Sequence, residues 1–164
     1  MKNNLVKISV FAFLVLSIGF IACEKDNEYI EGLKQDEIDA REAYLEAEGI
    51  TIAPTASGLY YIETETGTGV QAKAGDVVIV NYEGQLLNGY IFDTSWKPDG
   101  DFPIEFTLGT GAVIAGWDEA IALMKEGGKA KLIIPSDLAY GAQVKQSIPA
   151  YSTLVFYVDL VDVK

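Results

Sequence analysis

The pattern of apolar and polar positions in the second half of the chain predicts mainly β-strands. In residues 154–160 the side chains of Leu154, Phe156, Val158 and Leu160 alternate with others, so they share one face of a half-buried strand. Further strands are predicted where β-branched or alternating residues gather: 59–64, 76–87, 104–108 and 129–135. Turn residues at 54–58 separate this region from the segment before it.

Only one segment within this region repeats with helical spacing. Its apolar positions recur at intervals of three and four residues: Val113, Trp117, Ala120, Ile121 and Met124. Acidic Asp118 and Glu119 suit its first turn, and Gly127-Gly128 ends it. One short helix among many strands predicts an α+β fold, in which an antiparallel, twisted β-sheet wraps on one α-helix.

A second helix is predicted ahead of the strands, over residues 36–48. Ile38 and Leu45 give it an apolar stripe, and Gly49 is a good terminator. Residues 24–31 before it are predicted to be a polar tether. A single helix of this length is not stable alone, so it must pack on the domain or on a second copy of the chain. A homodimer is therefore left open.

The first 22 residues have the pattern of a secretory signal peptide. Lys2 and Lys7 precede an apolar run over 8–22, and no acidic residue occurs before Glu24. The run is shorter than the roughly 20 apolar residues that span a bilayer, which disfavours a retained anchor. The predicted organisation is a signal peptide (1–22), a tether with a short helix (23–54) and one folded domain (55–164).

The single cysteine, Cys23, ends the sequence Phe20-Ile21-Ala22-Cys23. This tetrapeptide resembles a lipobox, in which the cysteine is lipidated and becomes the mature N-terminus. The resemblance implies contact with a membrane through a lipid anchor, on the periplasmic side of a bacterial outer membrane. The acidic residues after Cys23 also resemble signals that send some lipoproteins to the cell surface, which is the alternative location.

Charge and composition limit the partners and the catalytic groups that the protein can use. The chain has 24 acidic and 12 basic residues, and without the leader ten basic residues remain, a net charge of −14. Such a surface repels phosphates, so nucleic acid is not an expected partner. No histidine is present, which excludes Ser-His-Asp and Cys-His systems and histidine metal sites. No metal or cofactor is expected.

Several sequence blocks occur together in a specific order over residues 75–164. They are GDVV at 75–78, NYEG at 81–84, IFDTS at 91–95, FTLG at 106–109, VIAGWDEA at 113–120, KAKLIIP at 129–135, AYGA at 139–142, IP at 148–149 and TLVFYVDL at 153–160. In this order they resemble the FKBP-type peptidyl-prolyl cis-trans isomerases. The resemblance implies the FKBP fold and a function in the folding of exported proteins.

The resemblance also implies the residues of the site. The polar residues to which it gives catalytic roles are Tyr82, Asp93 and Tyr140. The residues to which it gives contact with the substrate are Phe92, Ile104, Phe106, Val113, Ile114, Trp117, Ile148 and Phe156. In the family, the backbone N–H at the position of Ile114 and the hydroxyl at that of Tyr140 each bind a ligand carbonyl. The implied partners are proline-containing unfolded or extended polypeptides, with macrolides such as tacrolimus as further ligands.

These residue types suit the chemistry of amide rotation. The barrier is about 18–20 kcal/mol because rotation breaks C–N double-bond character. An aromatic pocket penalises the charge-separated planar imide more than the twisted transition state, so it binds the latter relatively better. Hydrogen-bond donors at the rim hold the flanking carbonyls. No nucleophile is needed, which agrees with a chain that lacks histidine.

Three departures from the family pattern keep a second function open. Ile104 stands where the family commonly has Phe, the stretch 94–102 is longer, and the loop 142–147 is shorter. The alternative is a non-catalytic FKBP-like chaperone or adaptor that binds extended segments. A hydrolase with paired carboxylates is less favoured, because nothing places two of Asp93, Asp99 and Asp101 across a cleft.

Overall fold

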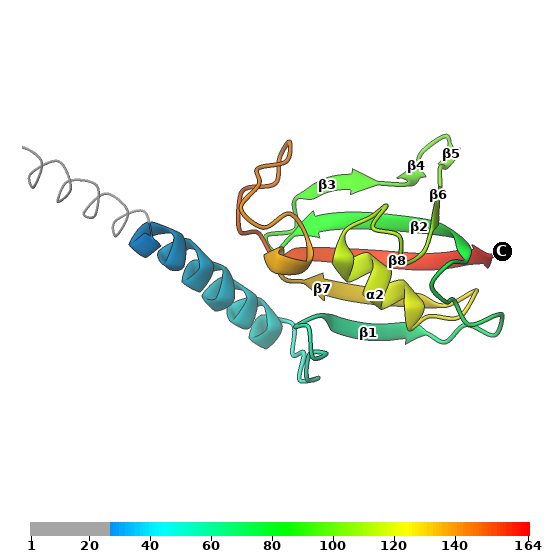
Figure 1. Ribbon diagram of the computed structural model, residues 1–164, viewed down its shortest axis with the longest axis horizontal. Coiled ribbons are helices and arrows are strands. Elements are labelled where there is room, and N and C mark those ends of the chain that lie inside the picture. The colour runs from blue at the N-terminus through cyan, green and yellow to red at the C-terminus, as the bar shows by residue number, and fades with distance from the viewer. Residues whose placement is uncertain (1–26) are drawn as a thin grey trace, which may run out of the picture. The chain divides into compact units, whose positions relative to one another are not determined.

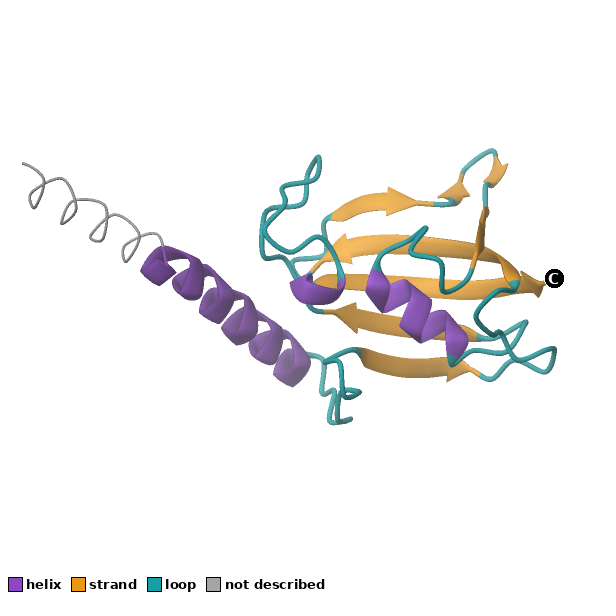
Figure 2. Cartoon of the chain, in the orientation of Figure 1, coloured by secondary structure: helices purple, strands orange, loops and turns teal. Residues whose placement is uncertain are grey.

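The computed structural model describes residues 27–164, in which one antiparallel sheet carries a short helix on one face (Figures 1 and 2). The strands are β1 (Tyr60–Glu65), β2 (Val77–Leu86), β3 (Ile91–Thr94), β4 (Trp96–Lys97), β5 (Gly100–Asp101), β6 (Ile104–Thr107), β7 (Lys129–Ile134) and β8 (Leu154–Val163). The sheet order is β1-β7-β8-β2-β3, and β6 pairs with β2. The helix α2 (Ala115–Ala122) lies across the sheet, and a 3-10 turn follows β7 at Ser136–Leu138.

The main core lies between α2 and the sheet. Trp117, Ala120 and Ile121 are buried on the inner side of the helix, against the inner side chains of β7 and β8. The helix can approach closely because it carries Gly116 at the contact, where a Cβ would lie 2.5 Å from Cγ2 of Ile134. A residue with a side chain there would force the helix away from the sheet.

The predicted fold class is confirmed, and the strands predicted over 59–64, 76–87, 104–108, 129–135 and 154–160 match β1, β2, β6, β7 and β8 within a few residues. The helix is shorter than predicted, because Val113 and Ile114 precede it. Ile114 is extended, with φ −62° and ψ 148°, and is the N-cap of α2. Strands β3, β4 and β5 are additions to the predicted set.

A helix over residues 27–47 precedes the strands. It includes residues 27–31, so the prediction of a tether there is wrong. Side chains one turn apart support it: Lys34 pairs with Glu31 at 3.1 Å, and Gln35 donates a hydrogen bond to Asp39 at 2.7 Å. None of the helices in residues 27–164 has the length and hydropathy of a membrane span.

The predicted signal peptide and Cys23 lie outside the described residues. The predictions made for them therefore rest on the sequence alone.

A second apolar cluster includes the last turns of this helix. Leu45 is buried with Ile133 and Val155, beside partly buried Tyr44, Ile50, Tyr60, Ile62 and Leu87. Ile133 alternates along β7 with Leu132 and Ile134 of the main core, so this cluster lies on the face of the sheet opposite α2. Glu48 accepts a hydrogen bond from Nζ of Lys131 at 2.8 Å at the edge of the cluster.

We expect Leu45→Ala to lower the free energy of unfolding by about 2 to 3 kcal/mol, because it leaves a cavity above Ile133 and Val155. Urea unfolding followed by circular dichroism measures this change. The control Glu46→Ala alters an exposed position of the same helix and is expected to change stability by less than about 0.5 kcal/mol. Equal midpoints for the two variants would show that the helix is not part of the core.

Candidate active site

A cavity of about 210 Å³ opens between α2 and the inner face of the sheet. Its lining residues come from β2, β3, β6, β8, α2 and the loops before α2 and after the 3-10 turn. They are Tyr82, Phe92, Asp93, Ile104, Ala112, Val113, Ile114, Trp117, Tyr140 and Phe156. The lining is mainly aromatic and aliphatic, which suits an apolar ring with a few polar contacts around it.

Trp117 forms a buried floor, with 3 % of its surface exposed. The rings of Tyr82 and Phe156 meet it edge to face, with centroids 5.1 and 5.2 Å away. Phe92 packs on Phe156 in the same way at 5.6 Å. Edge-to-face contacts fix the ring orientations, so the shape of the cavity is set before a ligand binds.

A glycine in β2 makes room for this aromatic wall. A Cβ at Gly84 would lie 2.6 Å from the ring of Phe92 and 2.7 Å from that of Phe156. Any other residue at Gly84 would therefore displace two walls of the cavity. Gly84 belongs to the NYEG block at 81–84, but the block itself does not indicate this steric role.

The rim carries one charged group, the carboxylate of Asp93. Its Oδ2 accepts a hydrogen bond from Oη of Tyr82 at 2.6 Å, and its Oδ1 accepts one from the backbone N–H of Thr94 at 2.9 Å. Burial and the neighbouring Asp93 raise the pKa of Tyr82 well above its usual range. The same two causes raise the pKa of Tyr140. Both phenols are therefore protonated donors at neutral pH.

The loop before α2 presents backbone to the cavity. The carbonyl of Ile114 accepts from the N–H of Trp117 at 2.9 Å, while its own N–H makes none of the backbone hydrogen bonds found in residues 27–164. Asp118 stabilises this loop, because its carboxylate accepts hydrogen bonds from the backbone N–H groups of Gly109 at 2.8 Å and Gly111 at 3.0 Å. Asp118, predicted only as an acidic residue of the first helix turn, thus also fixes the loop that carries the Ile114 N–H.

All of the predicted site residues except Phe106 and Ile148 line this cavity. Phe106 packs near Trp117 at 6.1 Å, and Ile148 is a buried core residue whose backbone pairs with Lys145. Ala112 lines the cavity without having been predicted. The catalytic roles of Tyr82, Asp93 and Tyr140 remain predictions. Residues 27–164 contain no group of His, Cys, Asp and Glu that could hold a metal ion.

The fold and the cavity together define a small antiparallel α+β domain with a preformed aromatic pocket and neutral hydrogen-bond donors at its rim. The family model that matches is the FKBP-type peptidyl-prolyl cis-trans isomerase, over residues 69–161, which is more than half of the chain. The chain therefore belongs to the FKBP-type peptidyl-prolyl cis-trans isomerase family.

Two relatives illustrate the similarity in sequence. The chain is 44 % identical over 124 residues to the FKBP-type peptidyl-prolyl cis-trans isomerase FkpA of Escherichia coli, covering 76 % of this chain and 44 % of that protein. It is 49 % identical over 94 residues to FK506-binding protein 2 of Debaryomyces hansenii, covering 57 % of this chain and 68 % of that protein. The match thus spans less than half of the length of FkpA.

Two solved structures are similar in fold. The crystal structure of FkpA from Escherichia coli has a TM-score of 0.71 and 34 % sequence identity, covering 100 % of this chain and 74 % of that one. A peptidyl-prolyl cis-trans isomerase from Pseudomonas syringae pv. tomato has a TM-score of 0.66 and 34 % identity, covering 79 % of this chain and 95 % of that one.

We expect Asp93→Asn to lower the pKa of Tyr82, because the tyrosinate no longer forms beside a carboxylate. The pKa should still exceed 10.0, since burial is the larger cause of the shift. NMR titration of tyrosine labelled at Cζ measures this directly. The control Asp99→Asn lies outside the cavity lining and is expected to leave the Tyr82 titration unchanged. A Tyr82 pKa that does not fall in Asp93→Asn would refute the coupling.

Proposed function

We propose that this protein catalyses cis-trans isomerisation of peptidyl-prolyl bonds and thereby assists the folding of exported proteins. The observation that carries the proposal is the cavity itself, an aromatic pocket floored by Trp117 with donors from Tyr140 and Ile114. Membership in the family supports it. The matched relative from Escherichia coli is named as an isomerase of this type, which also supports it.

The proposed mechanism needs no covalent step. The pyrrolidine ring enters the aromatic cavity, where the low polarity disfavours the charge-separated form of the planar imide. The N–H of Ile114 and the hydroxyl of Tyr140 then hold the two flanking carbonyls while the C–N bond turns. Asp93 orients the Tyr82 ring through the 2.6 Å hydrogen bond and keeps that wall in place.

The second candidate is a non-catalytic module that binds extended segments. Ile104 in the lining replaces an aromatic wall with an aliphatic one, and the loop over 142–147 carries a Val144 side chain that is 70 % exposed. The aliphatic wall and the exposed loop side chain would affect the binding of a polypeptide rather than the rotation of its imide bond. Macrolides remain candidate ligands of the same cavity, and a second copy of the chain remains a candidate partner.

For the location we propose a lipoprotein anchored by Cys23 to the outer membrane, facing the periplasm, with the cell surface as the alternative. The lipobox-like sequence ending at Cys23 and the apolar run over 8–22 support this. The net charge of −12 does not favour attraction to anionic headgroups, so the lipid would be the means of attachment.

Isomerisation of short proline peptides by a form that begins at Glu24 tests the enzymatic function. We expect acceleration well above the uncatalysed rate, and a loss of about tenfold or more in kcat/KM for the double variant Tyr82→Ala/Asp93→Ala. The matched control Tyr29→Ala/Asp36→Ala removes an exposed tyrosine and aspartate from the N-terminal helix and should keep full activity. No acceleration by a folded protein that still suppresses aggregation of unfolded clients would favour the binding module.

Replacement of the cysteine tests the anchor. We expect the full-length protein expressed in a Gram-negative host to incorporate labelled palmitate and to sediment with outer membranes, and Cys23→Ser to do neither. Phe20→Leu serves as the control, because it keeps the cysteine and brings the first lipobox position to the more usual residue. Equal membrane association of wild type and Cys23→Ser would exclude lipidation as the anchor.

A further inference from the structure

A second cavity, of about 230 Å³, lies at the C-terminal end of α2. Three alternate residues of β1, which are Tyr61, Glu63 and Glu65, form one of its walls. Leu123 and Met124 at the end of α2 form another. The lining residues of the two cavities, all within residues 27–164, do not overlap. The second cavity is therefore a separate candidate binding site.

The walls of this second cavity combine apolar surface with hydrogen-bond acceptors. Met124 is buried, and Leu123 is 49 % exposed. The side-chain amide of Gln71, a lining residue, donates to the carbonyls of Ala122 at 2.9 Å and Met124 at 2.7 Å. Both donors of this amide are used by the end of α2, so its Oε1 is left as an acceptor. Such walls suit a long side chain with an apolar stem and a donor group at its end.

A carboxylate without a partner gives the second cavity its charge. Glu63 makes no ion pair or hydrogen bond within residues 27–164, whereas Glu65 pairs with Lys129 at 3.1 Å. Burial and the neighbouring Glu63 raise the pKa of Tyr61, so its ring lies beside the carboxylate as a neutral phenol. Lys125 of the lining is exposed, and α2 has no basic residue in its last turn to offset its dipole. The lining therefore favours a cationic group.

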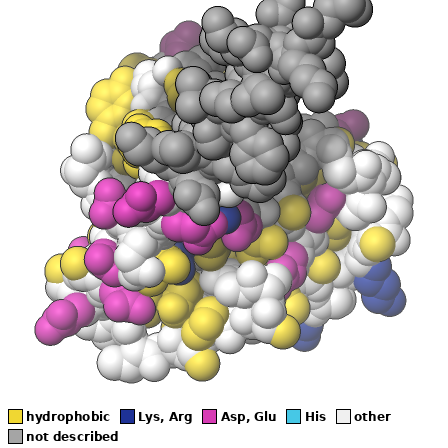
Figure 3. All heavy atoms as spheres, turned by 60° about the vertical axis from the view of Figure 1, so that its left-hand side comes forward, with side chains coloured by type: hydrophobic (Ala, Val, Ile, Leu, Met, Phe, Trp, Pro, Cys, Tyr) yellow, Lys and Arg dark blue, Asp and Glu magenta, His cyan; other side chains and the backbone are white. Residues whose placement is uncertain are grey.

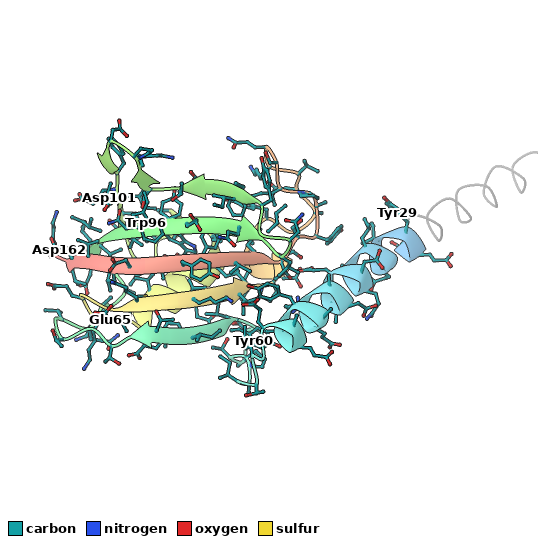
Figure 4. All side chains as sticks on the ribbon, turned by 180° about the vertical axis from the view of Figure 1, so that it is seen from behind. Tyr29, Tyr60, Glu65, Trp96, Asp101 and Asp162 are labelled. Carbon is teal, nitrogen blue, oxygen red and sulfur yellow. The ribbon has the colours of Figure 1, made fainter. Side chains whose placement is uncertain are left out.

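The strand that forms the acidic wall also ends the sheet (Figure 1). Figure 4 shows β1 running along the sheet edge from Tyr60 to Glu65. Within residues 27–164 its backbone hydrogen bonds are those with β7, so its outer edge is unpaired. Backbone groups on such an edge can pair with an extended chain. Alternate side chains of that added strand would point to the face on which the second cavity opens.

A second copy of the chain does not suit this edge. Antiparallel pairing of two copies through β1 would bring Glu63 and Glu65 of both copies to one face of the joined sheet, where like charges repel. The net charge of −12 adds to this repulsion. A segment with Arg or Lys meets the opposite condition, because its cationic group faces Glu63 while its alkyl stem lies on Tyr61 and Leu123.

We propose that β1 and the second cavity bind an extended, basic polypeptide segment, which adds a strand to the sheet and places an Arg or Lys side chain between β1 and the end of α2. The main chain of the segment pairs with the free edge of β1. Its cationic group binds Glu63 and Oε1 of Gln71. The site goes beyond the proposed isomerase function, because it needs no proline and shares no wall with the aromatic cavity.

Binding of a proline-free basic peptide to the full chain tests this site. Fluorescence anisotropy of fluorescein-labelled Thr-Arg-Val-Arg-Thr-Val measures the Kd. We expect Glu63→Gln to raise the Kd about fivefold, and Lys125→Gln to lower it about twofold because it removes a like charge. The control Glu46→Gln removes the same charge from an exposed position of the N-terminal helix, outside the lining, and should bind as wild type. An unchanged Kd in Glu63→Gln would overturn the site and leave that carboxylate only as protection of the edge.

Altered peptides cover the case in which a protein variant does not fold. Citrulline in place of Arg removes the charge and keeps the shape, and N-methylation of alternate residues removes main-chain donors. We expect each change to weaken binding to the unsubstituted protein about tenfold or more. Parental affinity of either altered peptide would overturn the proposal.

Competition with a proline tetrapeptide separates the two cavities. At a saturating concentration the tetrapeptide should leave the basic peptide bound, because the two ligands occupy different sites. Displacement of the basic peptide would place it in the aromatic cavity and overturn the second site. Absence of tetrapeptide isomerisation, with the basic peptide still bound, would instead overturn the isomerase function alone.

Discussion

The close packing of α2 on the sheet is the constraint on which the rest of the domain depends. Gly116 leaves no room for a side chain against Ile134, so the neighbouring Trp117 lies deep between helix and sheet. From there its ring contacts Tyr82 and Phe156 at about equal distances. A helix one methyl group further away would loosen these contacts and open the floor of the cavity. The aromatic pocket is thus a consequence of core packing rather than an addition to it.

The lining of the cavity contains a single acidic side chain and no basic one. The protein is acidic overall, and on the face shown in Figure 3 Asp and Glu side chains gather beside exposed hydrophobic ones while Lys and Arg are sparse. Inside the rim, however, Asp93 is the only charged lining residue, and both of its oxygens accept hydrogen bonds. Through these two hydrogen bonds the carboxylate orders the cavity wall formed by Tyr82 and the backbone at Thr94.

Periodicity predicted the strands because one face of each is buried, and β8 illustrates this with Leu154, Phe156, Val158 and Leu160 all buried. Periodicity gave a wrong prediction where contacts between residues distant in sequence determine the backbone conformation. Val113 continues the helical spacing, yet the chain is extended at Ile114, with the preceding loop held by Asp118. Nine cavity residues could be predicted only from the family blocks, because spacing alone cannot separate an aromatic residue of the pocket from one that packs beside the core, such as Phe106. Gly84 and Ser95 act through contacts distant in sequence, which no local pattern reveals.

The size of the cavity limits what it can recognise. About 210 Å³ accommodates a ring and its adjacent backbone, and its donors address carbonyl groups that every polypeptide has. Under the proposed function, such a pocket would select proline by the shape of its ring and would gain little from side chains farther along the polypeptide. Any discrimination among polypeptides would then have to come from surfaces outside the pocket.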